Sequence, residues 1–577
     1  MRRIAVVGAG QSGAQLALGL LGHGYEVTLV NDRTPEEVLR GPVLSSQCMF
    51  DAALQTERVL GLDLWAGECP DIDGVSMTIN GPDGTGSSGP PVHWVGRLDA
   101  PAQSVDQRVK LSRWMEELEA GGGRLRIQAA TPEQVDDLTR SNDLVVVATG
   151  KGELGRIFRT DRARSPYDKP QRALALTYVN GMQPRDDLSA VSYNVAPGVG
   201  EFFTFPALGP DGPCDIMVFE GLCGGPMDCW DDVRTPEQHL TRSLQILEAF
   251  FPAEYARCAD VTLTDAGGVL RGRLTPTVRK PVTTLASGGQ VLGLADAVVL
   301  NDPITGQGSN NAAKAAAFYL ESIVARGDKP FDESWMQGTF ESFWRGWAQW
   351  VTRWTNSVLA PPEPHLLDVY REAGHHRTLA DTIANGFDDP RALYQWWFDA
   401  EEAKRLVEEA RSAEVARFDP RDLRRAFGQY ATGVTVVTAR AEDGQRIGVT
   451  ANSFTSVSID PPLVLWCPAK TAPSLQAIKE ATHFAINVLA SDQHDLSRQF
   501  ATPAEDKFAG VSVTEGLHGV PLLDGTVASL ECRTVQLVEA GDHVICIGEV
   551  EKYDVAGGEP LVFHAGGYQV PTKHPDL

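Results

Sequence analysis

Six residues near the amino terminus, Gly8-Ala9-Gly10-Gln11-Ser12-Gly13, have the types and spacing of a turn that holds a pyrophosphate. The first glycine allows a tight turn, the second lets the backbone approach the phosphates, and the third permits close helix packing. The helix that starts here would present unpaired N–H groups to the phosphates. The motif alone does not separate FAD from NAD. We predict a dinucleotide site that includes Gly8, Gly10, Gln11, Ser12 and Gly13.

The residues on both sides of this turn predict a strand, a helix and a second strand. Residues 4–7 are an apolar run, an Ala/Leu-rich stretch follows to about Leu21, and YEVTLVND supplies the second strand. A carboxylate that binds the ribose is expected at the end of that second strand. Asn31 occupies the usual acidic position and Asp32 follows it, so either could contact the ribose, and we include Arg33 beside them.

Two later segments favour FAD. Residues 143–150, DLVVVATG, read as a buried strand that ends at a Thr-Gly turn, and residues 291–323 read as a strand, a loop and a long Ala-rich helix. Both are similar to FAD-dependent hydroxylases. The similarity implies that Asp296, which follows Ala295 in place of the usual Gly, binds the ribityl chain. A helix N-terminus would stabilise anionic reduced flavin by about 0.3–2 kcal/mol. The predicted contacts are Thr149, Gly150, Asp296, Pro303, Gly306, Gly308, Ser309 and Asn310.

Residues 1 to about 410 contain further distinctive sequence motifs. They are NDRTPEE, RLDAPAQSVDQR, LVVVATGK, SPYDKPQRAL, DPITGQGSN and TRWTN. On these phrases the region resembles the oxygenase component of styrene monooxygenase and its indole-oxidising relatives. Single-component aromatic hydroxylases carry an Asp-Gly motif for the NAD(P)H step where this chain has Ala148-Thr149-Gly150-Lys151. We therefore expect that this region does not reduce its own flavin.

The resemblance implies a multidomain α/β Rossmann-like FAD hydroxylase fold in region 1–410. An FAD domain would cover roughly 1–50, 96–179 and 271–330, a sheet-based substrate domain roughly 51–95 and 180–270, and helices 331–400. The styrene enzymes carry an Asn near flavin and substrate where this chain has Ser46, and the local sequence LSSQCMF looks more like the indole-oxidising branch. We take Ser46 and Gln47 as candidate substrate contacts, whereas Met49 and Phe50 are at least as well explained as core.

The segment 401–418, EEAKRLVEEARSAEVARF, predicts a semi-rigid helical linker. It pairs opposite charges at helical spacing, as at Glu401 and Arg405, although a solvated helix face explains the same pattern. After Pro420 the pattern changes to short β-rich runs with regular turns, which are typical of a small barrel. We therefore expect a separate all-β domain over residues 419–577.

This second half resembles the split-barrel flavin reductase components of two-component monooxygenases. The matches are FGQYATGV, TANSFTSVSIDPP, FAINVL, Gly541-Asp542-His543 and Tyr568. The resemblance implies a TANSF strand along the flavin, a Lys470 turn near phosphate, and a catalytic His543 near the nicotinamide, unless His543 is only an exposed turn residue. It also implies a homodimer through this domain. The predicted flavin contacts are Thr450, Ala451, Asn452, Ser453, Ser456, Lys470 and Ser474.

The composition excludes several other classes of protein. The chain has 577 residues and a net charge of −25, which argues against nucleic acid as a partner. No stretch approaches 18 consecutive apolar residues, and MRR runs directly into IAVVGAG, so we expect no membrane span and a cytoplasmic protein. Nine Cys occur without a CxxC pair or a His-paired cluster, so we expect reduced thiols and no metal site.

Together the two resemblances imply a self-sufficient flavin monooxygenase. NADH, in preference to NADPH, would reduce FAD in the barrel; with O2 the reduced FAD would form a C4a-hydroperoxyflavin in the first half and epoxidise a styrene- or indole-type double bond. The alternatives are an NADH:flavin oxidoreductase that makes peroxide, with a first half that only binds flavin, and a flavin-binding sensor without turnover. The sequence leaves open styrene against indole, the product enantiomer, the route of flavin transfer, the exact oligomeric state, and a separate partner oxygenase or reductase.

Overall fold

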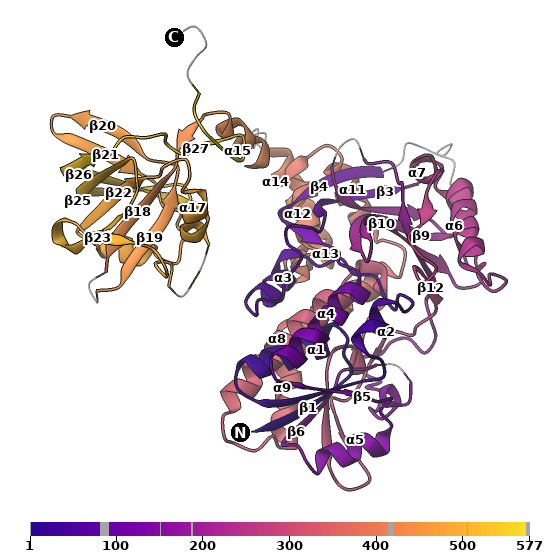
Figure 1. The fold of residues 1–577 in the computed structure, drawn as a ribbon. Coiled ribbons are helices and arrows are strands. Elements are labelled where there is room, and N and C mark those ends of the chain that lie inside the picture. The colour runs from indigo at the N-terminus through magenta and orange to yellow at the C-terminus, as the bar shows by residue number, and fades with distance from the viewer. Residues whose placement is uncertain are drawn as a thin grey trace. The chain divides into compact units, whose positions relative to one another are not determined.

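The chain divides into two compact units, Met1–Glu414 (unit 1) and Val415–Leu577 (unit 2). The computed structural model (Figure 1) describes residues 2–80, 92–150, 152–185, 188–412, 420–441, 444–502, 504 and 506–572. Unit 1 is mixed α/β and unit 2 is built mainly of strands. The predicted fold class is confirmed, and each unit is described by itself below.

Unit 1 contains a six-stranded sheet in the order β14-β15-β6-β1-β2-β5. All neighbouring pairs are parallel except β14 with β15. Helix α1 packs against α4 and α8 (Figure 1). The strands are β1 (Arg3–Val7), β2 (Glu26–Asn31), β5 (Arg124–Ile127), β6 (Leu144–Val147), β14 (Val282–Thr284) and β15 (Gln290–Gly293), and the helices α1 (Gln11–Gly22), α4 (Gln107–Ala120) and α8 (Gly308–Arg326).

A second sheet of eight strands has the order β11-β7-β10-β9-β8-β3-β4, with β12 also paired to β7. Its side chains alternate between two cores, since Ile216 and Val218 of β10 face one and Met217 and Phe219 face the other. The strands are β3 (Asp71–Ile79), β4 (Val92–Gln103), β7 (Arg172–Asn180), β8 (Ala190–Ala196), β9 (Gly200–Gly209), β10 (Gly212–Leu222), β11 (Thr262–Leu263) and β12 (Val269–Gly272).

Helices cover both faces of this second sheet. The Met217 and Phe219 side packs on α6 and α7, and the Ile216 and Val218 side packs on the helices that follow residue 349. These helices are α6 (Pro236–Phe250), α7 (Pro252–Cys258), α10 (Gln349–Val358), α11 (Pro364–Ala373), α12 (Arg377–Asn385), α13 (Tyr394–Trp397) and α14 (Ala400–Ser412). Unit 1 also has α2 (Pro35–Leu39), α3 (Asp51–Arg58), α5 (Pro132–Thr139), α9 (Glu333–Phe343) and the pair β13 (Thr277–Val278) and β16 (Val299–Leu300).

The segment predicted as a linker differs from the expectation in its first part. Residues 400–412 form helix α14, as the charge spacing indicates. However, Ala403 and Val407 are buried in the core beneath the second sheet, so this helix is part of unit 1 and not a free spacer. The remainder of the predicted linker, 413–418, lies outside the described residues.

Unit 2 is built on a seven-stranded antiparallel sheet in the order β19-β18-β22-β25-β26-β21-β20. A three-stranded sheet and a β23-β24 hairpin accompany it. The elements are β17 (Thr432–Gly433), β18 (Thr435–Arg440), β19 (Arg446–Ala451), β20 (Thr455–Ile459), β21 (Pro462–Trp466), β22 (His483–Val488), β23 (Val513–Glu515), β24 (Pro521–Leu523), β25 (Ala528–Ala540), β26 (His543–Val555), β27 (Val562–His564), β28 (Gly567–Gln569), α15 (Pro420–Gly428), α16 (Leu475–Glu480) and α17 (His494–Ala501).

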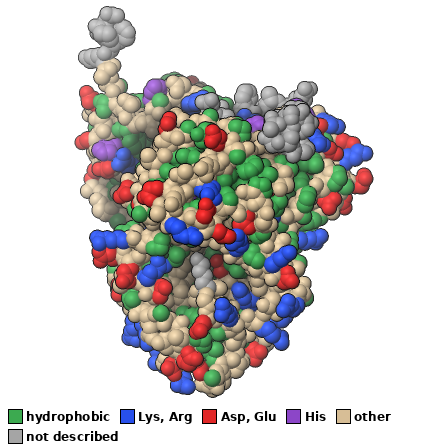
Figure 2. Space-filling view, turned by 90° about the vertical axis from the view of Figure 1, so that its right-hand side faces the viewer, with side chains coloured by type: hydrophobic (Ala, Val, Ile, Leu, Met, Phe, Trp, Pro, Cys, Tyr) green, Lys and Arg blue, Asp and Glu red, His purple; other side chains and the backbone are tan. Residues whose placement is uncertain are grey.

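The surface carries charges of both signs. In the face shown in Figure 2, Lys and Arg side chains lie among Asp and Glu side chains, so the net charge of −25 is not gathered into one acidic patch on this face. Within the described ranges, the helices are too short or too polar to cross a bilayer.

Candidate functional site

The predicted pyrophosphate turn joins the end of β1 to the start of α1. Gly8 has φ +106°, a conformation that favours glycine, and its N–H donates to the Val30 carbonyl at 2.8 Å. A Cβ on Gly13 would overlap the Gly8 carbonyl oxygen, whereas one on Gly10 would meet no described atom within 4 Å. The three glycines therefore have different environments, and open space adjoins Gly10.

Further predicted residues converge at the same edge of the sheet, because β1, β6 and β15 are parallel. A Cβ on Gly8 would lie 3.2 Å from Thr149 Cβ, and one on Gly150 would lie 2.5 Å from the backbone oxygen of Asp296. Ala295 has φ +48°, so the residue that replaces the usual Gly adopts the conformation for which Gly is preferred. The fold thus joins the first turn, the Thr-Gly turn and the Ala-Asp turn.

Two helix N-termini border this edge without a side-chain cap from the described residues. The N-cap of α1 is Gly10 and that of α8 is Gln307, and neither makes a capping hydrogen bond. The loop before α8 turns at Gly306, with φ +65°, and a Cβ on Gly306 or Gly308 would meet no described atom within 4 Å. Free N–H groups beside open space fit an anionic dinucleotide, so the residues present fit FAD.

Asn310 has a structural task in this arrangement. Its Nδ2 donates to the Cys48 carbonyl at 2.8 Å and to the Gly306 carbonyl at 3.1 Å, and its Oδ1 accepts the Phe50 N–H at 2.9 Å. The side chain is 1% exposed. Asn310 therefore fixes the first turn of α8 against the segment that contains the predicted substrate residues, and its amide is engaged with backbone groups.

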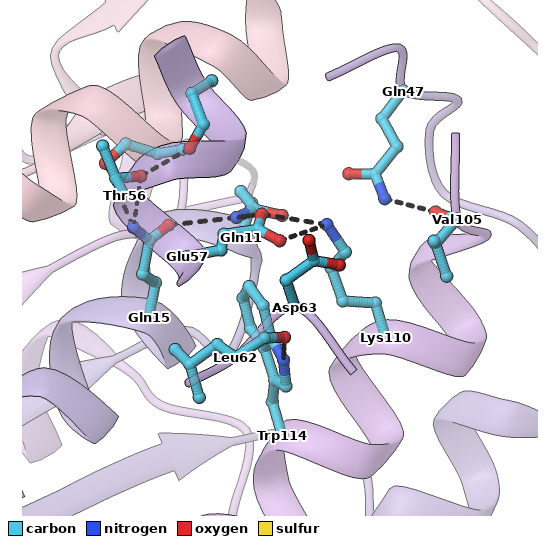
Figure 3. Close-up of polar contacts among 12 residues, drawn as sticks. Gln11, Gln15, Gln47, Thr56, Glu57, Leu62, Asp63, Val105, Lys110 and Trp114 are labelled. Atoms are coloured by element: carbon cyan, nitrogen blue, oxygen red, sulfur yellow. Dashed lines mark hydrogen bonds and ion pairs between the residues drawn. The ribbon is translucent and has the colours of Figure 1, made fainter. Parts of the chain in front are cut away.

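The side chain of Gln11 is buried and lies beside Gln15 and Glu57 (Figure 3). Its Nε2 donates to Glu57 at 2.8 Å and to Gln15 at 3.0 Å, and Glu57 pairs with Lys110 at 2.9 and 3.0 Å. Glu57 and Lys110 are each 1% exposed. The ion pair and the Gln11 amide nitrogen tie α1, α3 and α4 together, whereas Gln11 Oε1 has no hydrogen-bond partner among the described residues.

Of the two candidate substrate residues, Gln47 lies near this network (Figure 3). Gln47 is buried, its Nε2 donates to the Val105 carbonyl, and its Oε1 has no hydrogen-bond partner among the described residues. Ser46 is half-buried, and its carbonyl accepts the Ser45 hydroxyl at 2.9 Å. Met49 and Phe50 are buried in apolar clusters, which fits their explanation as core. Gln47 therefore retains one acceptor that a ligand could satisfy.

At the end of β2 the candidate ribose residues have different environments. Asn31 donates from Nδ2 to the Arg33 carbonyl at 2.7 Å and is thereby engaged in its own turn. The Asp32 side chain is 60% exposed and lies 3.6 Å from Arg33 Nε. Of the two alternatives, Asp32 has the carboxylate better placed to accept from a ribose hydroxyl.

Four charged side chains that the sequence analysis missed are buried near the loop before α8. Arg172 of β7 donates to both oxygens of Glu201 of β9, at 2.8 and 2.9 Å. Glu220 of β10 pairs with Glu201 in register, and its carboxyl contacts that of Asp302. Glu220 is 0% and Asp302 1% exposed. The cluster joins the second sheet to the residue directly before the predicted flavin loop.

Burial favours a proton on the Glu220–Asp302 pair. Two carboxyl groups hydrogen-bond to each other only if one of them is protonated. Neither Glu220 oxygen accepts a hydrogen bond from an N–H or O–H group of the described residues. Burial first, and then the charges of Asp302 and Glu201, raise the pKa of Glu220 well above its usual value. Burial raises the pKa of Asp302 to about 6. The pair can therefore retain a shareable proton near neutral pH.

An aromatic layer packs against the same loop. Trp354 of α10 meets Phe387 edge-on with ring centroids 5.1 Å apart, and Phe50 lies 5.9 Å from Phe387. The hydroxyls of Thr305 and Thr355 are 2.7 Å apart, which joins the loop to α10. The TRWTN phrase of α10 thus brings apolar rings beside the predicted flavin position.

A hollow of about 220 Å³ lies on another side of Phe50. Its lining includes four carboxylates, so we regard it as a poor site for an apolar ring. The residues are Phe50, Asp51, Leu98, Asp99, Ala100, Asn385, Asp388 and Asp389.

In unit 2 the fold joins two of the predicted segments. The Lys470 N–H donates to the Asp542 carbonyl at 2.8 Å, and Ala469 bridges to His543. His543 Nδ1 lies 2.8 Å from Asp542 Oδ1, and its side chain is 45% exposed. Lys470 Nζ pairs with Glu539 at 2.8 Å, so a phosphate at this turn would have to displace that carboxylate.

Backbone groups of neighbouring segments hydrogen-bond to two hydroxyl side chains of the TANSF segment. Thr450 Oγ1 donates to the Ser497 carbonyl at 2.6 Å, and the Ser497 hydroxyl lies 2.9 Å from that of Tyr568. Ser453 Oγ accepts the Cys467 N–H at 2.9 Å. Asn452 and Ser456 are exposed, Ala451 is half-buried, and Ser474 is the N-cap residue of α16 without a capping bond from its side chain.

Comparison with known proteins assigns both units. Residues 150–257 match the family described as "Styrene monooxygenase A putative substrate binding domain", and residues 427–572 match "Flavin reductase like domain". Styrene monooxygenase StyA of Pseudomonas sp. is 31% identical over 408 residues, which span 68% of this chain and 94% of that protein. The chain belongs to the styrene monooxygenase family. It joins a StyA-like region to a flavin reductase domain, as the sequence motifs indicate.

The relatives of unit 2 are flavin reductases. FMN reductase (NADH) SmoA of Agrobacterium fabrum is 47% identical over 148 residues, or 26% of this chain and 84% of that protein. The solved structure of the styrene monooxygenase flavin reductase from Pseudomonas putida S12 is 30% identical, covers 26% of this chain and 99% of its own, and has a TM-score of 0.25. This member of the styrene monooxygenase family therefore combines a flavin-dependent monooxygenase region with a flavin reductase.

Proposed function

We propose that the chain is a self-sufficient epoxidase of styrene- or indole-type double bonds. In the proposed reaction, NADH, a proton, O2 and the alkene give NAD⁺, water and the epoxide. The observation that carries the proposal is the presence on one chain of a region that covers 94% of StyA and a domain that covers 84% of an NADH-dependent flavin reductase. Each half supplies what the other lacks, because the reductase produces the reduced flavin that a monooxygenase consumes.

FAD is the flavin that unit 1 fits best. A pyrophosphate turn at 8–13 is of use to a dinucleotide and not to FMN, which carries a single phosphate. Gly8, Gly10 and Gly13 would hold the pyrophosphate, Asp32 the ribose, and the loop before α8 the ring. When bound and reduced, the flavin supplies the activation of O2.

The protein's own groups then orient the reactants and exclude water. The rings of Phe50, Trp354 and Phe387 offer an apolar boundary that suits an aromatic alkene. The Glu220–Asp302 pair keeps a proton beside the loop, where it can balance negative charge without opening the site to solvent. Gln47 Oε1 is an acceptor that suits the N–H of an indole-type substrate.

Unit 2 would transfer hydride from NADH to FAD beside His543. The printed name of the Agrobacterium relative supports NADH. A shared chain keeps the donor of reduced flavin near its acceptor, which raises the effective concentration of that flavin.

A homodimer through unit 2 is part of the proposal. Val457 and Ile459 of β20, the last strand of its sheet, are 49% and 91% exposed, and Tyr553 and Val555 of β26 are 71% and 68% exposed. Exposed apolar side chains on strands favour burial against a second copy. A cytoplasmic location is also proposed, because all nine cysteines are free thiols.

The second candidate function is an NADH:flavin oxidoreductase that releases peroxide. This function would need unit 2 alone, and residues 427–572 match the flavin reductase family. The test is aerobic incubation of the full chain with NADH, FAD and styrene or indole, in which NADH loss, peroxide and organic product are followed together. Epoxide or indigo supports the epoxidase; NADH loss matched by peroxide alone would refute it in favour of the oxidoreductase.

A further inference from the structure

Three side chains that are far apart in the sequence meet on the surface of unit 2. His483 Nε2 lies 3.6 Å from Glu551 Oε2, and His518 Nε2 lies 3.8 Å from the same oxygen. The two imidazole rings stack with centroids 3.8 Å apart and an interplanar angle of 18°. The three ligand atoms all lie within 4.8 Å of one another. Two imidazole nitrogens and one carboxylate oxygen therefore lie close enough together for one ion to reach all three.

The local backbone explains why these groups converge. Glu531 pairs with Lys552 and Cys532 with Val550, so Glu551 is the extra residue of a β-bulge in β26. A bulge redirects a side chain from the regular alternation of a strand. His518 sits in the β23–β24 turn with φ +55°, which points its ring toward the start of β22, where His483 lies. Three separate elements thus supply one ligand each.

Neighbouring groups orient the ligands. Arg533 Nε lies 3.4 Å from Glu551 Oε1 and leaves Oε2 to face the imidazoles. Thr482 Oγ1 lies 2.9 Å from His483 Nδ1, so the nitrogen that faces Glu551 remains Nε2. Outer partners of this kind fix the tautomer and orientation of metal ligands in proteins. The side chains of His483, Glu551 and His518 are 16%, 30% and 56% exposed, which leaves an open side for water.

We propose that His483, His518 and Glu551 bind one divalent transition-metal cation of the Zn²⁺ type. Zn²⁺ takes imidazole nitrogen at about 2.0–2.1 Å and carboxylate oxygen at about 2.0–2.2 Å, which in a tetrahedron sets ligand atoms about 3.4 Å apart. The two nitrogen–oxygen distances, 3.6 and 3.8 Å, are close to this separation, and binding would turn the stacked imidazole rings so that the ion lies in both ring planes. Water would complete the tetrahedron. The bound cation would clamp the β23–β24 turn onto the sheet.

The sequence pattern did not predict this site. Its ligands are separated by 35 and 33 residues and come from a strand start, a turn and a bulge, so no short spacing announces them. The proposed site departs from the expectation of no metal site, which rested on cysteine and histidine spacing alone.

The test is a calorimetric titration of the EDTA-stripped full chain with ZnCl2 at pH 7.5, where most unperturbed imidazoles are neutral. His518→Asn removes one ligand but keeps a residue that tolerates positive φ, and Glu551→Gln keeps the shape of the side chain. We expect one Zn²⁺ per chain, a rise in the melting temperature of unit 2, and affinity at least 10-fold weaker in both variants.

The matched control is His494→Asn, because His494 lies 3.4 Å from Asp495 in the same unit and forms an exposed His–carboxylate pair for which the described residues supply no third ligand. The control variant should bind Zn²⁺ as the wild type does. Absence of binding by the wild-type chain would overturn the proposal. Equal affinity in wild type, His518→Asn and Glu551→Gln would overturn it as well, because the ion would then lie elsewhere.

Discussion

Replacement of Glu220 by Gln tests the buried proton in unit 1. Burial raises the folded-state pKa of both Glu220 and Asp302 above their usual values. Stability from such groups is fully present below the unfolded-state pKa and is lost as pH rises through the folded-state pKa. For Asp302 the rise from 3.8 to about 6 is roughly 2 pH units, or about 3 kcal/mol at 1.36 kcal/mol per unit.

In Glu220→Gln the amide can donate to Asp302 without any bound proton, so Asp302 should ionise at lower pH. The wild type should therefore lose more stability than the variant between pH 5 and pH 8, by about 1.4 kcal/mol, because only the last pH unit of the Asp302 interval from 3.8 to about 6 lies above pH 5. Tryptophan fluorescence in a urea series measures the free energy of unfolding of unit 1. Among the 12 tryptophans, only Trp466 lies in unit 2. The control is Glu248→Gln on the exposed side of α6.

The difference between variant and wild type is the quantity to compare, since it removes every titration that the two proteins share. A difference in the free energy of unfolding that stays constant from pH 5 to pH 8 would refute a shared proton between Glu220 and Asp302. The reasoning would fail in the same way if Glu248→Gln reproduced the pH dependence of Glu220→Gln.

Three further changes separate the parts of the site. Lys110→Met should destabilise unit 1 by about 3–5 kcal/mol in urea unfolding, because Glu57 would remain buried without its partner; a cost under about 1 kcal/mol would contradict a dry ion pair. Gly13→Ala places a Cβ on the Gly8 carbonyl and should abolish organic product while NADH oxidation by unit 2 continues, and full product formation would disprove the predicted turn. His543→Asn should lower kcat for NADH oxidation about 100-fold, at the low end of acid–base contributions, with fluorescence melting unchanged; a change below twofold would leave His543 as a turn residue.

Contiguous motifs were predictable from the sequence because their residues act through local backbone geometry. Gly8 and Gly13 lie five residues apart, and the turn they form depends on φ values and helix packing that the residue types themselves impose. The strand and helix that flank them follow from apolar periodicity. The two-unit organisation was predictable for a similar reason, since the β-rich pattern begins near residue 432, soon after the division at 414 and 415.

The buried charges were not predictable because they depend on strand pairing. Arg172, Glu201 and Glu220 come from three strands, and only the register of β9 with β10 places Glu201 opposite Glu220. The available signals were two: Glu220 within the apolar strand IMVFEGL, and Asp302 as the first residue of DPITGQGSN. The burial of helix α14 was not predictable either. Its segment is highly charged, and the two buried side chains, Ala403 and Val407, do not form a clear apolar pattern.

Isotope labelling tests the central claim most directly. The full chain is incubated under ¹⁸O2 with FAD, styrene and NADH as the only reductant, with catalase present to remove free peroxide. The account predicts one NADH consumed per epoxide in the coupled fraction and one ¹⁸O atom in each epoxide. NADH oxidation that yields neither labelled epoxide from styrene nor indigo from indole would contradict a self-sufficient monooxygenase. It would leave an NADH:flavin oxidoreductase.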